Sequence, residues 1–234
     1  MNRFLLVAFI CVYPMTVLRA DPGQLENQES TAVRAAHEDP EDSADAFLRR
    51  HYSDVVAVAL PAGFVADGRF PEDVKWMVTV RVLPANPDEE RECVVTLRKH
   101  YDQKVSVHSI CALPTSVALQ IRKLLRKQPD DDWQSLAKSM QVEQWDGSET
   151  AQAQLRQLAV EFEAIRLDAV LPDELILHGT AYEIWCQSLW GNRMKLELLG
   201  PGPEATEQPH PLITWFEKLR TFVESARESK TPSN

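Results

Sequence analysis

The sequence predicts an α+β fold in which antiparallel β-hairpins, or a β-meander, are covered by amphipathic helices. Apolar and polar residues alternate over 74–83, and two further stretches, 93–111 and 174–202, have the pattern of hairpins. Runs with apolar residues at helical spacing follow both hairpins. Alternation with period two is typical of half-buried strands, and a period of 3.6 is typical of helices. Hairpins followed by covering helices favour a single α+β layer.

The pattern divides the chain into four segments. We expect a signal peptide over 1–20, a disordered acidic leader over 21–43, one main α+β domain over 44–228 and a disordered tail over 229–234. The leader contains seven acidic residues and only two large apolar ones. Such a composition buries too little apolar surface to offset the entropy of ordering the chain, so it favours disorder.

The N-terminus has the features of an export signal. Arg3 supplies positive charge, nine consecutive apolar residues follow from Phe4 to Val12, and Ala20 is a small residue suited to the position before a cleavage site. A membrane span needs about 20 mainly apolar residues, and Pro14 and Arg19 interrupt the stretch. We therefore expect a periplasmic or secreted protein with no transmembrane span in its mature chain. An uncleaved N-terminal anchor is the alternative.

The charge of the chain argues against one class of partner. The net charge is −10, and cleavage after Ala20 removes two arginines and no acid, which makes it −12. Nucleic-acid binding requires a basic footprint because the phosphate backbone dominates the affinity. The composition thus excludes nucleic acid as the expected partner.

The first elements of the domain precede the first hairpin. Residues 44–52 predict a short helix capped by Ser43, and the β-branched run 55–60 predicts a first strand. The alternation over 74–83 predicts a second strand with one apolar face and one mixed face.

The first hairpin predicts a disulfide. Pairing residues whose numbers sum to 204 places the valine and leucine side chains on one face and sets Cys93 directly opposite Cys111. Residues that face each other across an antiparallel ladder have Cα atoms about 4.5 to 5.5 Å apart, within disulfide range. Because an exported chain meets an oxidising compartment, we expect a Cys93–Cys111 disulfide. Two free, half-buried thiols are the alternative.

Three helices are predicted between the hairpins. The first follows Pro114 and has basic residues on its outer side, which fit either a solvated face or a site for an anionic partner. A short helix contains Trp133 and begins after the acids 130–132, which suit a capping role. The third and clearest has Ser148 as its expected N-cap.

The second hairpin is predicted by pairing residues whose numbers sum to 382, with its turn around 190–192. This register places Cys186 on an inward aliphatic face, where a small buried thiol is common and inert. A catalytic nucleophile is the alternative, and it would need a neighbouring base. A final helix is expected to start at Pro211 and to bury one broad apolar stripe.

The other face of the second hairpin is a candidate partner surface. Trp185 and Leu199 point to this face, and Trp190 lies at the tip of the turn. An exposed aromatic residue beside charges is a common feature of protein interfaces. The alternative is that a helix covers Trp185, since large apolar residues are usually buried.

The sequence contains no recognisable catalytic signature. It has no Gly-x-Ser-x-Gly, His-Glu-x-x-His, phosphate-loop or dinucleotide-binding motif, so we assign no catalytic, metal-binding or cofactor-binding residues. We therefore expect a non-catalytic extracytoplasmic protein that binds another protein or an envelope component. The alternative is a hydrolase or metal-dependent enzyme with scattered site residues. A deep pocket with converging polar side chains would favour the second class, and a flat exposed patch the first.

Overall fold

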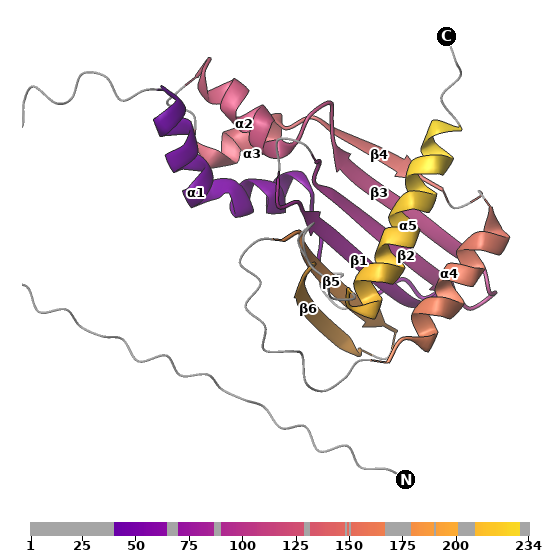
Figure 1. Ribbon diagram of the computed structural model, residues 1–234. Helices are drawn as coiled ribbons and strands as arrows, with labels where there is room; N and C mark the ends of the chain where they lie inside the picture. Colours follow the sequence, from indigo (N-terminus) through magenta and orange to yellow (C-terminus); the bar gives the residue numbers. More distant parts are fainter. Residues whose placement is uncertain are drawn as a thin grey trace, which may run out of the picture. The chain divides into compact units, whose positions relative to one another are not determined.

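A six-stranded antiparallel sheet lies at the centre of the fold (Figure 1). In this computed structural model the strand order is β4-β3-β2-β1-β5-β6. The strands are β1 (Val74–Leu83), β2 (Cys93–His100), β3 (Val105–Ala112), β4 (Val142–Asp146), β5 (Ala181–Ser188) and β6 (Arg193–Leu199). The central β1 pairs with both β2 and β5, so the two predicted hairpins belong to one sheet. The α+β class is confirmed.

The structure describes residues 40–64, 70–86, 90–128, 132–147, 149, 151–166, 179–189, 191–200 and 209–229. The predicted signal peptide, nearly all of the predicted leader and the tail from 230 onward lie outside these residues. The described residues belong to the unit Asp39–Asn234. No helix among them is long and apolar enough to cross a membrane.

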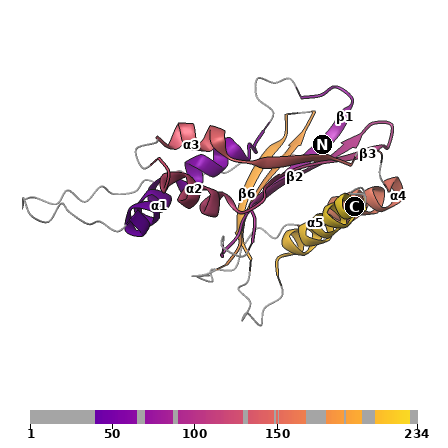
Figure 2. The ribbon, with the colours of Figure 1, turned by 90° about the horizontal axis from the view of Figure 1, so that it is seen from above.

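Two helices cover one face of the sheet (Figure 2): α4 (Gln152–Ala164) and α5 (Pro211–Glu228). Between them and the strands lies the larger apolar core, which includes Val80, Leu97, Ile184, Leu155 and Phe216. The predicted final helix is confirmed: Pro211 occupies its first turn, and its apolar stripe is buried. Burial of about 25 cal/mol per Å² of apolar surface is the main force that holds both helices on the sheet.

The start of α4 differs from the prediction. Its N-cap position is Ala151, and Ser148 lies outside the described residues. The next residue, Gln152, exchanges two hydrogen bonds with the backbone of Val105: its amide nitrogen donates to the carbonyl oxygen over 2.8 Å, and its amide oxygen accepts from the N–H over 3.3 Å. The helix therefore begins where its first side chain can bond to β3.

A second helical layer consists of α1 (Pro40–Ala59), α2 (Val117–Leu125) and α3 (Trp133–Ser139). The predicted strand over 55–60 is wrong, because α1 continues to Ala59. Val55, Val56 and Leu60 are fully buried against α2 and α3 within a second apolar core. Together with Tyr52 they recur at helical spacing, so packing against two neighbouring helices outweighs the strand preference of β-branched residues.

Both helices after the first hairpin have side-chain caps. The hydroxyl of Ser116 accepts a hydrogen bond from the N–H of Leu119 at the start of α2. The carboxylate of Asp132 accepts from the N–H groups of Gln134 and Ser135 at the start of α3. The predicted capping role of the acidic run is thus confirmed for Asp132, whereas residues 129–131 lie outside the described part of the chain.

Glu92 joins the second helical layer to the sheet. Its side chain is fully buried and accepts hydrogen bonds from the hydroxyl of Tyr52 over 2.6 Å and from the N–H of Val117 over 2.7 Å. Burial and the nearby Glu92 carboxylate raise the pKa of Tyr52 well above its usual range, so its phenol stays a hydrogen-bond donor. A buried carboxylate at the N-terminus of α2 is stabilised by these donors and by the helix dipole.

The two hairpins differ in how well the sequence predicts them. In the first, the observed pairs sum to 204, as predicted, and they include Cys93 opposite Cys111. In the second, the residue numbers of each observed pair sum to 380, so the predicted register is wrong by two residues. Because a shift of two leaves every side chain on the same face, the predicted face of Cys186 is still correct. The short edge strand β4, where only Trp145 is buried, was not predicted.

Candidate functional site

A cleft of about 590 Å³ opens between the C-terminal half of α5 and the adjoining parts of β2, β3 and β4. We call it the thiol cleft, because two cysteines of the sheet line it together with three arginines. The lining residues are Glu90, Arg91, Cys93, Val95, Cys111, Leu113, Glu143, Arg220, Val223, Glu224, Arg227 and Glu228.

The ladder brings the two cysteines together. Cys93 begins β2, and Cys111 faces it from β3. The neighbouring pair is hydrogen-bonded, since the N–H of Ala112 donates to the carbonyl oxygen of Glu92 over 3.0 Å. Hydrogen-bonded and non-hydrogen-bonded pairs alternate, so Cys93 and Cys111 form a non-hydrogen-bonded pair, in which Cα atoms are about 4.5 Å apart. This separation lies within the range that a disulfide bridges without backbone movement.

Both cysteines are free thiols in the structure, so the predicted disulfide is not present. Instead, the hydrogen bond between the two thiols shifts their pKa values in opposite directions, up for Cys93 and down for Cys111. This bond and burial raise the pKa of Cys93 well above the usual value for a thiol. The pair is therefore asymmetric: one sulfur stays protonated while the other is prepared to ionise.

Arg227 completes the environment of Cys111. It lies in the last turn of α5 and donates a hydrogen bond from Nη1 to the sulfur of Cys111 over 3.2 Å. Its Nη2 pairs with the carboxylate of Glu143 on β4, which holds the guanidinium over the sheet. The hydrogen bond from Cys93, together with the charge and hydrogen bond of Arg227, lowers the pKa of Cys111 to about 7, against the opposing effects of burial and Glu143. A large share of Cys111 is therefore thiolate at neutral pH.

Cys186 on β5 has neither of these partners. Burial alone raises its pKa to about 11. It sits opposite Met194 of β6 and Val78 of β1 on the helix-covered face. These surroundings are those of an inert thiol.

The three residues of the predicted partner surface have different surroundings. Trp185 is only 7% exposed, because the guanidinium of Arg81 and the ammonium of Lys195 lie over its ring, 5.3 and 5.6 Å from the centroid. Side chains of the sheet, not a helix, make these contacts. Leu199 is 48% exposed at the end of β6. Trp190 lies outside the described residues.

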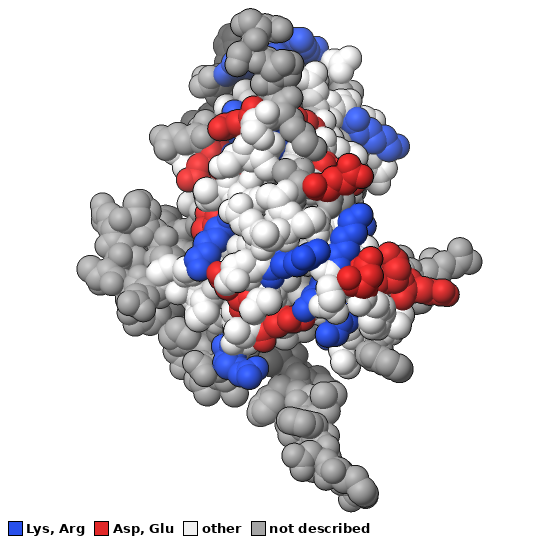
Figure 3. Space-filling view, turned by 90° about the vertical axis from the view of Figure 1, so that its right-hand side faces the viewer, with Lys and Arg blue, Asp and Glu red and all other residues white. Residues whose placement is uncertain are grey.

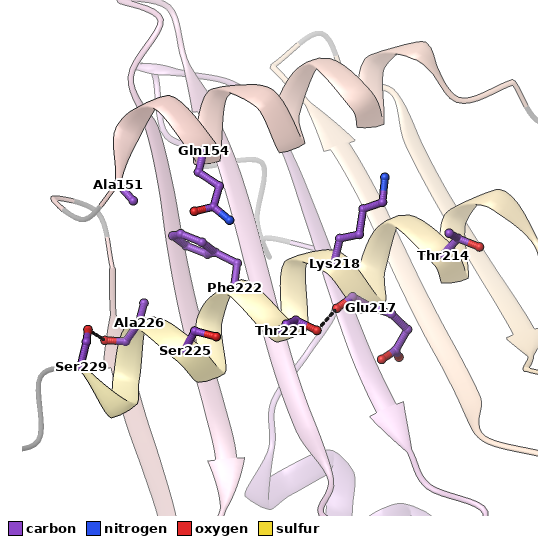
Figure 4. A pocket seen from close by; sticks show the side chains of 10 residues that line it. All are labelled: Ala151, Gln154, Thr214, Glu217, Lys218, Thr221, Phe222, Ser225, Ala226 and Ser229. Carbon is purple, nitrogen blue, oxygen red and sulfur yellow. Dashed lines mark hydrogen bonds between the residues drawn. The ribbon is translucent and has the colours of Figure 1, made fainter.

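A second hollow, of about 620 Å³, runs between α4 and α5 (Figure 4). Gln154 of α4 and Phe222 of α5 project into the space between the helices. Two of its four hydroxyl groups bond to backbone carbonyl oxygens of α5: Thr221 donates to that of Glu217, and Ser229 donates to that of Ala226. This groove therefore offers mostly helix-surface contacts, in contrast to the thiol cleft.

Two surface properties bear on partners and metals. Acidic and basic side chains are interspersed on the face shown in Figure 3. Within the described part of the chain, no group of three or more His, Cys, Asp or Glu side chains is arranged to hold a metal ion.

Comparison of the chain with protein-family models, with curated proteins and with solved structures found no match.

Two members of this site were predictable from the sequence, and the third was not. The alternating pattern of the first hairpin identified the facing cysteines. Arg227 is separated from Cys111 by 116 positions. A final helix from Pro211 was predicted, but nothing in the sequence indicated that Arg227 would contact β3.

Proposed function

We propose that this protein is exported and that its thiol cleft is a redox-active dithiol, which exchanges with disulfide-bonded partners and closes to a Cys93–Cys111 disulfide. The observation that carries the proposal is the position of the Cys111 sulfur, between the thiol of Cys93 and the guanidinium of Arg227, in the wall of an open cleft.

The pKa of Cys111 suits this chemistry. The thiolate is the attacking species in thiol–disulfide exchange, but its intrinsic nucleophilicity declines as its pKa falls. The best attacking thiol therefore has a pKa near the ambient pH. At about 7, Cys111 meets this condition. Cys93, which stays protonated, suits the second step as the resolving thiol.

The exchange takes place in two balanced steps. The thiolate of Cys111 attacks one sulfur of a partner disulfide, so a mixed disulfide forms and the other partner sulfur leaves as a thiolate. Cys93 then loses its proton and attacks the sulfur of Cys111, which releases the second partner thiolate. The two released thiolates take up the two protons that the dithiol has lost. The partner is reduced by two electrons, and the dithiol becomes a disulfide.

The compartment to which the protein is exported determines whether the dithiol or the disulfide form prevails. The N-terminal pattern supports a periplasmic or secreted location, and oxidising compartments favour the disulfide form. Recovery of a mature chain that begins at Asp21 from the extracytoplasmic fraction, shown by its intact mass, tests this part of the proposal. Full-length protein confined to the cytosol would contradict it.

A glutathione titration tests the exchange. The reduced protein is equilibrated at pH 7 with buffers of increasing ratio of oxidised to reduced glutathione, quenched with acid, alkylated and mapped by peptide mass. We expect the Cys93–Cys111 disulfide to appear and to reopen at a reproducible midpoint, with the Cys186 thiol free throughout. A stable glutathione adduct on Cys111 without ring closure would contradict the proposal. So would a disulfide that fails to reopen, since it would be a structural crosslink.

A further inference from the structure

The outer edge of β6 carries a separate inference, independent of the thiol cleft. β6 ends the described sheet, and no described strand pairs with its outer side. Its inner side bonds to β5, where the N–H of Ser188 donates to the carbonyl oxygen of Asn192 and the N–H of Gly200 donates to that of Thr180. Because the inward groups alternate along a strand, the even-numbered residues of β6 bond to β5. The backbone groups of the odd-numbered residues point outward.

Several side chains of β6 are also exposed to solvent. Met194 is 36% exposed and Leu199 is 48% exposed. The side chains of Lys195 and Glu197 are 43% and 67% exposed and pair with each other along the strand. An edge strand with exposed backbone groups and apolar side chains is a template for a further strand.

We infer that β6 is a self-association edge, on which a second copy of this chain pairs its own β6 antiparallel about a two-fold axis at Leu196. In this register the residue numbers of each pair sum to 392. Lys195 then faces Glu197 of the second copy, and the two-fold axis repeats this pair with the roles exchanged. Met194 faces Leu198, and Arg193 faces Leu199.

The charges select this register over its neighbours. A sum of 390 would set Arg193 against Glu197 but would also set Lys195 against Lys195 of the second copy, and a sum of 394 would set Glu197 against Glu197 of the second copy, so only the sum of 392 has no pair of like charges. Like charges directly opposite each other destabilise a ladder, whereas opposite charges stabilise it. All three registers pair the outward-facing odd residues with each other and so use the available backbone groups, which leaves the charges to distinguish between them. A self-complementary surface of this kind is what a two-fold interface requires.

Charge exchange tests the inference directly. The mature chain is studied in reductant by sedimentation velocity over a concentration series, with folding checked by circular dichroism. Lys195→Glu sets two Glu–Glu pairs across the axis, and Glu197→Lys sets two Lys–Lys pairs. We expect each single variant to raise the dimer dissociation constant at least about tenfold. Lys123→Glu makes the same charge change on an exposed part of α2 and leaves dimerisation unchanged.

The decisive sample is an equimolar mixture of Lys195→Glu and Glu197→Lys. In the mixed dimer both cross-axis pairs are again Glu–Lys, so association should return to the level of the unmodified chain. The double variant Lys195→Glu/Glu197→Lys should dimerise by the same logic. Because recovery on mixing needs two folded chains, it separates a lost interface from misfolding. A chain that is monomeric at all concentrations, or single variants that do not recover on mixing, would overturn the inference.

Discussion

The two hairpins of the sheet have the same type of turn, but the surroundings of Cys111 and Cys186 shift the thiol pKa in opposite directions. In the first, the N–H of His100 donates to the carbonyl oxygen of Lys104 over 2.9 Å, and Gln103 has a positive φ of 68°. In the second, the N–H of Ser188 donates to the carbonyl oxygen of Asn192 over 3.1 Å, and Gly191 has a φ of 76°. Both are three-residue loops whose last residue is left-handed. Similar backbone geometry therefore does not decide how the cysteines behave.

The difference comes from what lies across each strand. Cys111 has a thiol donor on the facing strand and a guanidinium from α5, and its pKa is lowered to about 7. Cys186 has only burial, and its pKa is raised to about 11. Burial alone disfavours the thiolate, and partners that donate or carry positive charge reverse that preference. The comparison shows that the facing thiol of Cys93, together with Arg227 from the covering helix, makes Cys111 reactive, whereas the turn geometry does not.

The largest expected effect comes from removing the thiol donor. Cys93→Ala eliminates both the hydrogen bond to Cys111 and the resolving sulfur. We expect reversible intramolecular disulfide formation to be lost completely and the pKa of Cys111 to rise. The pH dependence of alkylation, followed by peptide mass, measures this change. Cys93→Ser keeps a hydroxyl donor, so it should restore part of the low pKa without restoring the disulfide, and Cys186→Ala should change neither property.

Removing the guanidinium should have the next largest effect. Arg227→Met keeps a long side chain and deletes the charge beside Cys111. Because the pKa of Cys111 then moves toward the ordinary value of about 8.5, its rate of alkylation at pH 7 should fall about tenfold. Lys218→Met, which removes a charge elsewhere on α5, is the matched control. An unchanged rate in Arg227→Met would show that the arginine does not activate the thiol.

Cys111 and Cys186 should change the folding stability in opposite directions as the pH rises. Between pH 7 and about 8.5, Cys111 is ionised in the folded chain but protonated in the unfolded chain, so folding stability rises with pH by about 1 to 2 kcal/mol. That contribution is lost as the pH falls through 7. Between about 8.5 and 11, Cys186 stays protonated only in the folded chain, so its contribution is lost as the pH rises.

Urea unfolding of the reduced protein at a series of pH values measures these contributions. Cys111→Ala should abolish the rise between pH 7 and 8.5, and Cys186→Ala should make the decline above pH 8.5 shallower. A stability curve that is identical in Cys111→Ala and the unmodified chain would refute the ionisation of Cys111 at neutral pH.

The turns provide the smallest effect. Gly191→Ala puts a side chain at φ 76°, where no heavy atom lies within 4 Å, so backbone strain alone should cost about 1 kcal/mol of folding free energy. Gln103→Gly relieves the corresponding strain in the first hairpin, and we expect it to stabilise the protein by up to about 0.5 kcal/mol. Denaturant midpoints measure both changes in stability. Because the two substitutions are expected to act in opposite directions, equal changes in stability would mean that the two loops are not equivalent.

Much of the fold was predictable because side-chain periodicity records which face is buried. The class, the register of the first hairpin and the final helix follow from it. The second register was missed because the predicted turn was centred on Gly191, whereas Gly191 occupies the third, left-handed position of the loop. The N-terminal helix was cut short because Val55 and Val56 favour strands locally, and only their contacts with α2 and α3 keep them helical.

Only the part of the candidate site that lies within one hairpin could be predicted from the sequence. Facing cysteines follow from the pairing of two adjacent strands. The contact between Cys111 and Arg227 depends on how α5 crosses the sheet, which a single sequence does not encode in a local pattern. The register places the two sulfur atoms within reach of each other but does not determine whether they are thiols or a disulfide.

The most direct test of the account is the rate of iodoacetamide alkylation at each cysteine of the reduced, unmodified protein from pH 5 to 10. Peptide mass spectrometry resolves Cys111 and Cys186 in one sample. We predict a midpoint near pH 7 for Cys111 and a rate for Cys186 that is still rising at pH 10. A shared midpoint near the ordinary thiol value of about 8.5 would contradict the account, because it would mean that neither Cys93 nor Arg227 activates the cleft.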